Sequence, residues 1–232
     1  MINSVQNEKI KNYAKLNEKK YRDETNMFIV EGAHLVEEAK NFGIVKEILT
    51  TNPNIDGTLV SEEVMKKLTN QKSVVEVCAI CEKFKKEEIT NKILILDTIQ
   101  DPGNIGTLIR SAVAFGFDTI VMEACCDIYS SKVLRATQGA IFKLNIINAK
   151  TDTFITSLYG YKVYGTSLKN GVPLKTIEKA DKLAIILGNE GNGVRSELLD
   201  MTDKNIFIEI TNMESLNVGV AGAILMYELG GK

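Results

Sequence analysis

Three segments in the C-terminal half of this chain share one order, in which an apolar strand is followed by a polar loop and then by a helix. They are ILILDTIQDPGNIGTLIRSA at 93–112, AIILGNEGNGVRSELL at 184–199 and IFIEITNMESLNVGVAGAILMYEL at 206–229. Parallel α/β sheets bring such loops together at the carboxyl ends of their strands, where they form a ligand crevice. The three segments therefore predict a mostly parallel sheet with a ligand site, most naturally a cofactor site.

The rest of this half alternates strands with helices, which predicts a sheet covered by helices on both faces. The expected strands lie at 119–124, 141–147, 162–167, 183–187 and 206–210, and the expected helices at 130–138, 152–159 and 217–229.

The N-terminal part predicts a smaller α/β unit. Its expected helices lie at 4–20, 33–42 and 61–69, and its expected strands at 27–32, 44–50 and 73–80. The polar stretch CEKFKKEEITN at 81–91 separates this unit from the strand KILILDTI. We therefore place a boundary near residue 90, between domains at 1–90 and 91–232.

Composition excludes several classes of protein. An apolar content of 44% in 232 residues is typical of a globular protein rather than a disordered one. The N-terminus has no apolar signal core, and VGVAGAILMYEL is too short to span a bilayer, so we expect a cytoplasmic protein. Cys78 and Cys81 form a lone CxxC, and Cys125 and Cys126 are adjacent. Zinc needs a second well-spaced ligand pair, so we predict no metal site.

The net charge of −2 gives no general argument for nucleic-acid binding, but the basic residues are unevenly distributed. Residues 1–22 contain six Lys or Arg side chains against two Glu. Such a run is typical of a surface that faces phosphates, and equally of a solvated helix face with nothing bound.

The first junction predicts a turn followed by a helix. Pro102 and Gly103 suit the second and third positions of a type II turn, after which Asn104 would cap the helix. The apolar residues that follow recur at helical spacing and predict one buried face, formed by Ile105, Leu108, Ile109 and Ala112.

Arg110 points away from that face, and its neighbour one turn earlier is Gly106, which leaves room for another molecule. The chain has 24 Lys and only four Arg, so an arginine here is a minority choice. A planar, permanently charged fork suits phosphate, carboxylate or a developing oxyanion, although an ordinary surface arginine is the alternative.

The second and third junctions have different signatures. Gly188, Gly191 and Gly193 would allow backbone groups to approach a flat ligand closely. Their GxxGxG order, late in the sheet, differs from the dinucleotide-binding GxGxxG. In the third junction Ser215 and Asn217 precede a helix that is apolar almost all round, so we expect its N-terminus to be buried and to need polar partners.

With these residues in place, the chain resembles the SpoU (TrmH-like) 2'-O-ribose RNA methyltransferases of the SPOUT superfamily. DPGNIGTLIRSA, LGNEGNGV and IEITNMESLNVGVAGAILMYEL resemble the family's three motifs in their order. The block KKYRDETNMFIVEGAHLVEEA resembles the family's L30e-like substrate-binding domain. Glu209 departs from the pattern, in which the third motif more often has proline.

The resemblance implies S-adenosylmethionine as cofactor, a deep trefoil knot in the C-terminal chain, and a homodimer whose interface lies beside the cofactor. It implies a catalytic region formed by Asn104, Arg110, Glu190, Ser215 and Asn217. It implies cofactor binding by Leu187, Gly188, Asn189, Gly191, Ile208, Ile210, Ser215, Leu216 and Asn217. We also expect RNA contacts by Lys19, Lys20 and Arg22 of the basic run, and by Arg135.

Methylation of a ribose 2'-hydroxyl requires a weakly acidic oxygen to lose its proton while it attacks a methyl group. The three junctions hold no His, Cys or Lys, and His34, the only histidine, begins an N-terminal helix. Arg110 remains. Because a free guanidinium stays protonated, we favour stabilisation of the oxyanion and anchoring of phosphate, and leave a role as base open.

Three readings compete. The first is an RNA ribose methyltransferase, with ribosomal RNA favoured over transfer RNA, and the 2'-hydroxyl distinguishes RNA from DNA. The second is a non-catalytic RNA-binding dimer, which the presence of Arg110 and Asn217 disfavours. The third is a nucleotide-dependent oxidoreductase, which the absence of an early GxGxxG disfavours.

Overall fold

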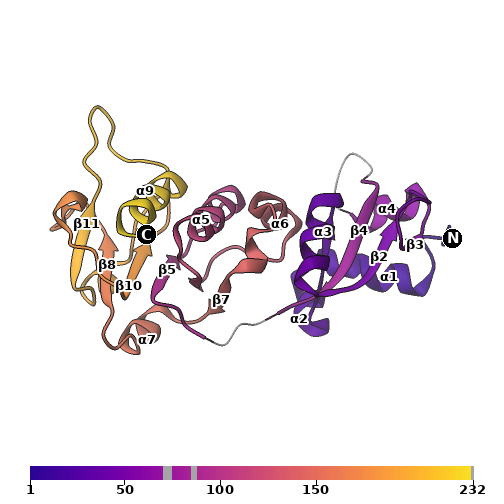
Figure 1. Cartoon of the computed structure of the whole chain (residues 1–232), viewed down its shortest axis with the longest axis horizontal. Helices are drawn as coiled ribbons and strands as arrows, with labels where there is room; N and C mark the ends of the chain where they lie inside the picture. The colour runs from indigo at the N-terminus through magenta and orange to yellow at the C-terminus, as the bar shows by residue number, and fades with distance from the viewer. Residues whose placement is uncertain (70–74, 85–87, 231–232) are drawn as a thin grey trace. The chain divides into compact units, whose positions relative to one another are not determined.

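The structure, a computed structural model, describes residues 1–69, 75–84 and 88–230. The chain forms two compact units (Figure 1). Unit 1 contains Met1–Phe84 together with Asp127–Phe142, and unit 2 contains Lys85–Cys126 together with Lys143–Lys232. A single boundary near residue 90 does not describe this division, because a segment from the middle of the chain completes unit 1.

Unit 1 is built on a four-stranded sheet in the order β1-β4-β2-β3. The strands are β1 (Met27–Glu31), β2 (Val45–Thr50), β3 (Thr58–Leu59) and β4 (Val77–Glu82). The helices are α1 (Glu8–Ala14), α2 (Lys19–Thr25), α3 (Ala33–Phe42), α4 (Glu62–Leu68) and α6 (Ser131–Thr137), with 3-10 turns at Lys15–Asn17 and Ala140–Lys143. β4 runs antiparallel to both β1 and β2.

Local sequence signals identified some of these helices and misplaced another. α3 has its predicted bounds, and α4 begins after Ser61, whose hydroxyl accepts a hydrogen bond from the Val64 N–H. The predicted helix at 4–20 is wrong, since α1, a 3-10 turn and α2 replace it. Asn7 caps α1, and the extended backbone of Glu18 (φ −102°, ψ 135°) separates α2 from the preceding turn. The predicted strand at 73–80 begins at Val77, and its first two residues lie outside the described residues.

Residues 127–142 belong to unit 1 because they supply part of its packing. The ring of Tyr129 lies 4.6 Å from that of Phe28. Phe142 packs near Phe42 and Phe84, with both ring-centroid distances at 6.1 Å. Local sequence patterns do not predict that residues 127–142 pack with the N-terminal residues of unit 1.

Unit 2 contains a seven-stranded sheet in the order β7-β6-β5-β10-β8-β11-β9, and every pairing in it is parallel. Its strands are β5 (Lys92–Asp97), β6 (Thr119–Glu123), β7 (Asn145–Asn148), β8 (Lys162–Thr166), β9 (Val172–Pro173), β10 (Leu183–Leu187) and β11 (Lys204–Phe207). Its helices are α5 (Pro102–Phe115), α7 (Thr151–Thr156), α8 (Ser196–Leu199) and α9 (Val218–Gly230), with a 3-10 turn at Leu174–Thr176.

Helices cover both faces of this sheet, as the alternation predicts. Ile93, Ile95 and Ile186 pack in one apolar cluster with residues of α7 and α8. Strand side chains alternate between faces, so Leu187 points to the other side, where α5 and α9 pack. A Cβ atom on Gly222 of α9 would lie 2.7 Å from the Leu187 side chain and 2.3 Å from that of Leu108. Glycine there permits close packing of α9.

Four predictions from the C-terminal part of the chain need correction. The expected strand at 141–147 is a 3-10 turn followed by β7, and the expected strand at 206–210 is β11, which ends at Phe207. The expected type II turn is the first turn of α5, which begins at Pro102 because the first helical position needs no N–H. Asp101 provides the cap in place of Asn104, since its carboxylate accepts the Asn104 N–H at 2.8 Å. The short α8 is the helix that ends the second junction, whereas the short β9 was not predicted.

Candidate functional site

A cavity of about 840 Å³ lies in unit 2 at the carboxyl ends of three strands. The chain segments that follow β8, β10 and β11 form most of its wall, and Ala221 and Leu225 of α9 contribute the rest. This volume is in the range of pockets that hold small molecules and cofactors. The carboxyl edge of a parallel sheet is also where such pockets form.

The structure brings all of the predicted cofactor-contact residues to the wall of this one cavity. They are Leu187, Gly188, Asn189, Gly191, Ile208, Ile210, Ser215, Leu216 and Asn217. Apolar side chains and glycine backbone therefore stand together on the wall, which suits a ligand with a flat apolar part and polar edges.

The loop at 188–194, which we call the glycine loop, folds tightly on itself. The backbone of Asn189 exchanges two hydrogen bonds with that of Gly193, at 3.1 and 2.8 Å. A Cβ atom on Gly188 would lie 2.1 Å from the Gly193 carbonyl carbon and from the Val194 nitrogen, so no other residue fits there. Gly193 has φ +70°, which glycine adopts without strain. The fold of this loop needs glycine at both positions.

Three polar side chains, one from each junction, form a hydrogen-bonded chain that we call the relay. Asn104 donates to Glu190 at 2.8 Å and accepts from Asn217 at 2.9 Å. The Asn217 side-chain oxygen accepts the Gly219 N–H at 2.9 Å and the Val220 N–H at 3.3 Å, and so caps α9. Asn104 is therefore the central member of a link between the three loops.

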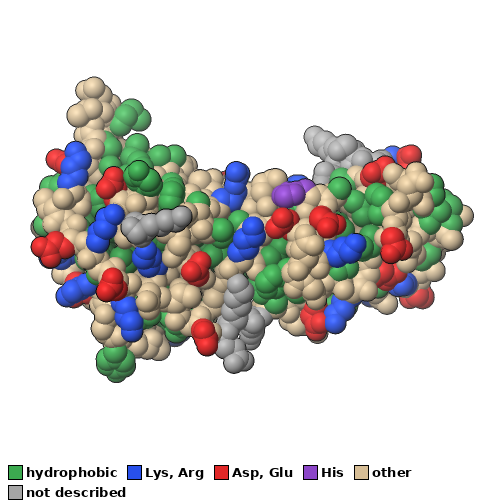
Figure 2. Space-filling view, in the orientation of Figure 1, with side chains coloured by type: hydrophobic (Ala, Val, Ile, Leu, Met, Phe, Trp, Pro, Cys, Tyr) green, Lys and Arg blue, Asp and Glu red, His purple; other side chains and the backbone are tan. Residues whose placement is uncertain are grey.

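The N-terminus of α9 differs from the expectation of burial. Ser215 and Asn217 are exposed in the single chain, and Val220 and Tyr227 are 48% and 65% exposed. Figure 2 shows hydrophobic side chains gathered at the surface over α9. The helix is apolar almost all round, yet one of its faces is not covered by any residue that the structure describes.

Arg110 lies on the exposed face of α5, while Ile105, Leu108, Ile109 and Ala112 are fully buried as predicted. Among the described residues no hydrogen-bond or ion-pair partner contacts its guanidinium, and it is not part of the cavity wall described above. Its charge is therefore available to another molecule.

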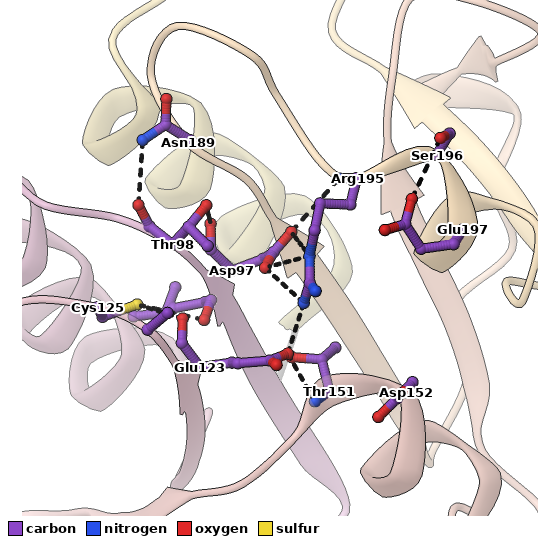
Figure 3. A network of polar contacts seen from close by, with 12 residues as sticks. Asp97, Thr98, Glu123, Cys125, Thr151, Asp152, Asn189, Arg195, Ser196 and Glu197 are labelled. Atoms are coloured by element: carbon purple, nitrogen blue, oxygen red, sulfur yellow. Dashed lines mark hydrogen bonds and ion pairs between the residues drawn. The ribbon is translucent and has the colours of Figure 1, made fainter.

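A cluster of charged residues at the end of the glycine loop was not predicted from the sequence (Figure 3). Arg195 Nε lies 2.9 Å from Asp97 Oδ1, and Arg195 Nη2 lies 2.5 Å from Glu123 Oε2. Burial raises the pKa of Glu123, but the Thr151 N–H and Arg195 outweigh it, so the pKa is lowered. An acid at the last position of two neighbouring strands was the signal available in the sequence.

The predicted RNA-contact residues have two kinds of environment in unit 1. Lys19 and Lys20 are exposed and pair with acids on their own helix, Asp23 at 2.5 Å and Glu24 at 3.9 Å. Arg22 is 5% exposed and contacts Asp127 and the Leu16 carbonyl oxygen.

The prediction that Arg22 faces RNA phosphates does not match this placement, because Arg22 is buried and the partly buried carboxylate of Asp127 occupies its guanidinium. Arg135 is partly exposed, and its guanidinium lies 2.7 Å from Glu31. His34 is at the surface (Figure 2), where its ring contacts the Gln138 carbonyl oxygen at 3.2 Å.

Within residues 1–69, 75–84 and 88–230, no group of three or more His, Cys, Asp or Glu side chains is placed to hold a metal ion. Cys78 and Cys81 are buried in β4, and burial raises the pKa of each thiol to about 12. Over the same residues no helix has the length and apolarity needed to cross a membrane.

Residues 91–227 match the SpoU rRNA Methylase family, and residues 7–79 match the MRM3-like substrate binding domain. The first match covers more than half of the chain. The protein belongs to the SpoU rRNA methylase family.

Individual relatives agree with this assignment. The chain is 40% identical to the 23S rRNA (guanosine(2553)-2'-O)-methyltransferase RlmP of Bacillus subtilis (strain 168), over 99% of both chains. It resembles the AdoMet-bound rRNA methyltransferase from Sinorhizobium meliloti at 29% identity, with a TM-score of 0.87 over 98% of this chain and 96% of that one. AviRb from Streptomyces viridochromogenes, 19% identical with a TM-score of 0.84 over 97% of each chain, shares the fold.

Proposed function

We propose that this protein transfers a methyl group from S-adenosylmethionine to a ribose 2'-hydroxyl of ribosomal RNA. The observation that carries the proposal is the convergence of the second and third junctions on one cavity, with the relay joining the first junction to both of them. The full-length similarity to a 23S rRNA 2'-O-methyltransferase and the likeness to an AdoMet-bound rRNA methyltransferase support the reaction and the cofactor.

The residues on the cavity wall fit S-adenosylmethionine. The apolar side chains of Leu187, Ile208 and Leu216 suit the faces of an adenine ring, and the backbone of the glycine loop can approach the ring edge and ribose. When bound, the cofactor supplies an electrophilic methyl group. The protein holds it through backbone and apolar contacts that need no proton transfer.

Arg110 is the residue that we assign to the reacting oxygen. Its guanidinium, which pairs with no residue that the structure describes, can stabilise the oxyanion that forms as the 2'-hydroxyl loses its proton, and can hold the adjacent phosphate. The relay ties the first turn of α5 to the loop of Glu190 and to the start of α9. Ser215, exposed on the cavity wall, is a further polar group for the same ribose.

We propose that two copies associate through the exposed apolar face of α9. Val220 and Tyr227 are large, exposed and on one helix, and Phe115 of α5 packs against Tyr227 with ring centroids 5.6 Å apart. An apolar surface of this kind marks an interface. A second copy seated there would lie next to the cavity, to which Ala221 and Leu225 of the same helix belong.

We also propose that the C-terminal chain forms the deep trefoil knot of this family. The convergence of three loops on one cavity and the return of α9 to α5 support this path. Connections in proteins are otherwise almost always unknotted, so family membership carries this proposal.

Unit 1 is the part that we assign to RNA selection, since residues 7–79 match a substrate binding domain. Lys19 and Lys20 are two of the exposed cations in the basic run and can contact phosphates. Ribosomal RNA is favoured over transfer RNA by the relative's substrate. We place the activity in the cytoplasm, where bacterial ribosomes are assembled.

The test is mass mapping of 2'-O-methyl groups in total RNA from cells with and without this protein. We expect one site in large-subunit ribosomal RNA to lose its methyl group, and the position that corresponds to guanosine 2553 is the first to inspect. Re-expression of the wild-type chain restores the group, and re-expression of Arg110→Ala does not. An unchanged ribosomal RNA together with a lost transfer-RNA site would replace the proposed substrate.

A further inference from the structure

Two carboxylates stand side by side at the carboxyl ends of neighbouring strands. Asp97 ends β5, Glu123 ends β6, and the two residues are partners in the parallel register. Each is followed by a residue with positive φ, Thr98 at 61° and Ala124 at 49°. A β-branched residue in this region is strained, and such strain persists only where the surrounding contacts hold it.

Arg195 bridges the two carboxylates (Figure 3). Its Nε contacts both carboxylate oxygens of Asp97, at 2.9 and 3.1 Å, and its Nη2 contacts Glu123 Oε2 at 2.5 Å. Its own backbone N–H also points to Asp97 Oδ2 at 3.3 Å. Asp97 is completely buried, so it needs a charged partner, and Arg195 provides one.

The bridge acts on the glycine loop because Arg195 is the next residue after it. Leu187 anchors the start of the loop in β10, and Arg195 anchors its end. Between these anchors the Asn189 side-chain amide donates to the Thr98 carbonyl oxygen at 3.1 Å. The loop that lines the cavity is thus tied near its start to the strained residue Thr98 and just after its end to Asp97, the last residue of β5.

Glu123 is itself held in place, so the bridge has a fixed support. Its Oε2 accepts the Thr151 N–H at 2.9 Å, at the start of α7. The bridge therefore connects β5, β6 and α7 to one end of the glycine loop.

We propose that Arg195 is a positioning residue for the cofactor: by bridging Asp97 and Glu123 it holds the glycine loop in the shape that binds S-adenosylmethionine. The inference rests on the proposed function, since it concerns the same cavity. Its guanidinium is occupied by the two carboxylates, so it acts through the backbone of the loop.

Direct contact of the guanidinium with the cofactor is the competing account, because Arg195 also lines the cavity. The two accounts differ for Glu123→Gln. Loss of the Glu123 charge weakens the bridge but leaves Arg195 in place, so only the positioning account predicts weaker cofactor binding.

The experiment compares the full-length wild-type protein with Glu123→Gln, Arg195→Lys and the control Glu197→Gln. Glu197 has the same charge and is two residues from Arg195, but its carboxylate contacts Ser196 and takes no part in the bridge (Figure 3). Calorimetry measures the Kd for S-adenosylmethionine, and steady-state kinetics measure the cofactor KM and kcat.

We expect Glu123→Gln and Arg195→Lys to raise the Kd and the cofactor KM about tenfold, the scale of coupling within one polar network. We expect kcat at saturating cofactor to stay within about threefold, and Glu197→Gln to match the wild type. An unchanged Kd for Glu123→Gln would overturn the inference, as would a lower Tm with unchanged KM. If the wild-type protein binds no S-adenosylmethionine, the proposed function itself fails and the inference fails with it.

Discussion

The two units use their arginines in opposite ways. In unit 1 both arginines, Arg22 and Arg135, contact carboxylates, and the exposed cations of its first helices are lysines. In unit 2, Arg195 is occupied by two carboxylates, whereas no described residue pairs with Arg110 on α5. An arginine is thus available to a substrate only where the fold leaves no carboxylate opposite it.

The comparison is tested most strongly at Arg110. Arg110→Ala should lower methyl transfer by about 100-fold or more, the scale that follows removal of one preorganised oxyanion donor, with cofactor affinity nearly unchanged. Arg110→Lys should rescue little, because an ammonium cannot reproduce the bidentate fork. Single-turnover methylation and calorimetry provide the measurements.

Lys179→Ala is the control for Arg110, since Lys179 is a cation of the same unit beside the start of β5, at the edge of the sheet away from the cavity. It should keep the wild-type rate. Wild-type turnover by Arg110→Ala would show that Arg110 has no part in the reaction. The two units would then not differ in having an arginine that acts on the substrate.

Arg22 should behave as a structural residue. Arg22→Met leaves Asp127 without its partner, and we expect a loss of roughly 2–3 kcal/mol in the free energy of unfolding of unit 1. Denaturant unfolding followed by the tyrosines of the protein measures it. The salt dependence of RNA binding by the folded fraction should stay as in the wild type, and a smaller slope would place Arg22 on phosphate after all.

Lys19 and Lys20 should show the reverse pattern. The double variant Lys19→Ala with Lys20→Ala removes two exposed cations whose ion pairs contribute little to stability. Each lost phosphate contact should reduce the slope of log K against log salt by about 0.7 for single-stranded RNA. Binding titrations over a range of salt give the slope, and an unchanged slope would identify the basic run as a solvated helix face.

Acid should affect the two units to different extents. The lowered pKa of Glu123 means that its contribution to stability is complete above the unfolded pKa, near 4.5, and is lost as the pH falls through the folded value. Asp23 in unit 1 has its pKa lowered to about 2 by Lys19 and Lys83, but it is half exposed and solvent screens its pairs.

We therefore expect the Tm difference between wild type and Glu123→Gln to shrink as the pH falls below about 4.5. Asp23→Asn should differ little from the wild type at any pH in this range. Calorimetric scans at several pH values measure both Tm differences. Equal pH dependence for the two variants would contradict the expectation that acid affects Glu123 more than Asp23.

Much of the fold follows from local patterns in the sequence. The β-branched strands of unit 2, the apolar face of α5 and the cap of α4 at Ser61 all depend on neighbours within a few residues. The predicted start of α5 was wrong because two neighbouring side chains could cap the helix. Asp101 caps it, one turn before the predicted cap Asn104.

The parallel α/β class and the three junctions could be predicted from the sequence alone, because strand, loop and helix follow each other directly in the chain. The residues that gather at the cavity were expected from the family resemblance of those junctions. Only the tertiary structure decided which charges are free. Arg22 meets Asp127 and Arg195 meets Asp97 across separations of 105 and 98 residues. The relay likewise joins Asn104 to Asn217 across 113 residues. No local pattern encodes such pairs, because burial and pairing depend on what the folded chain places opposite each side chain.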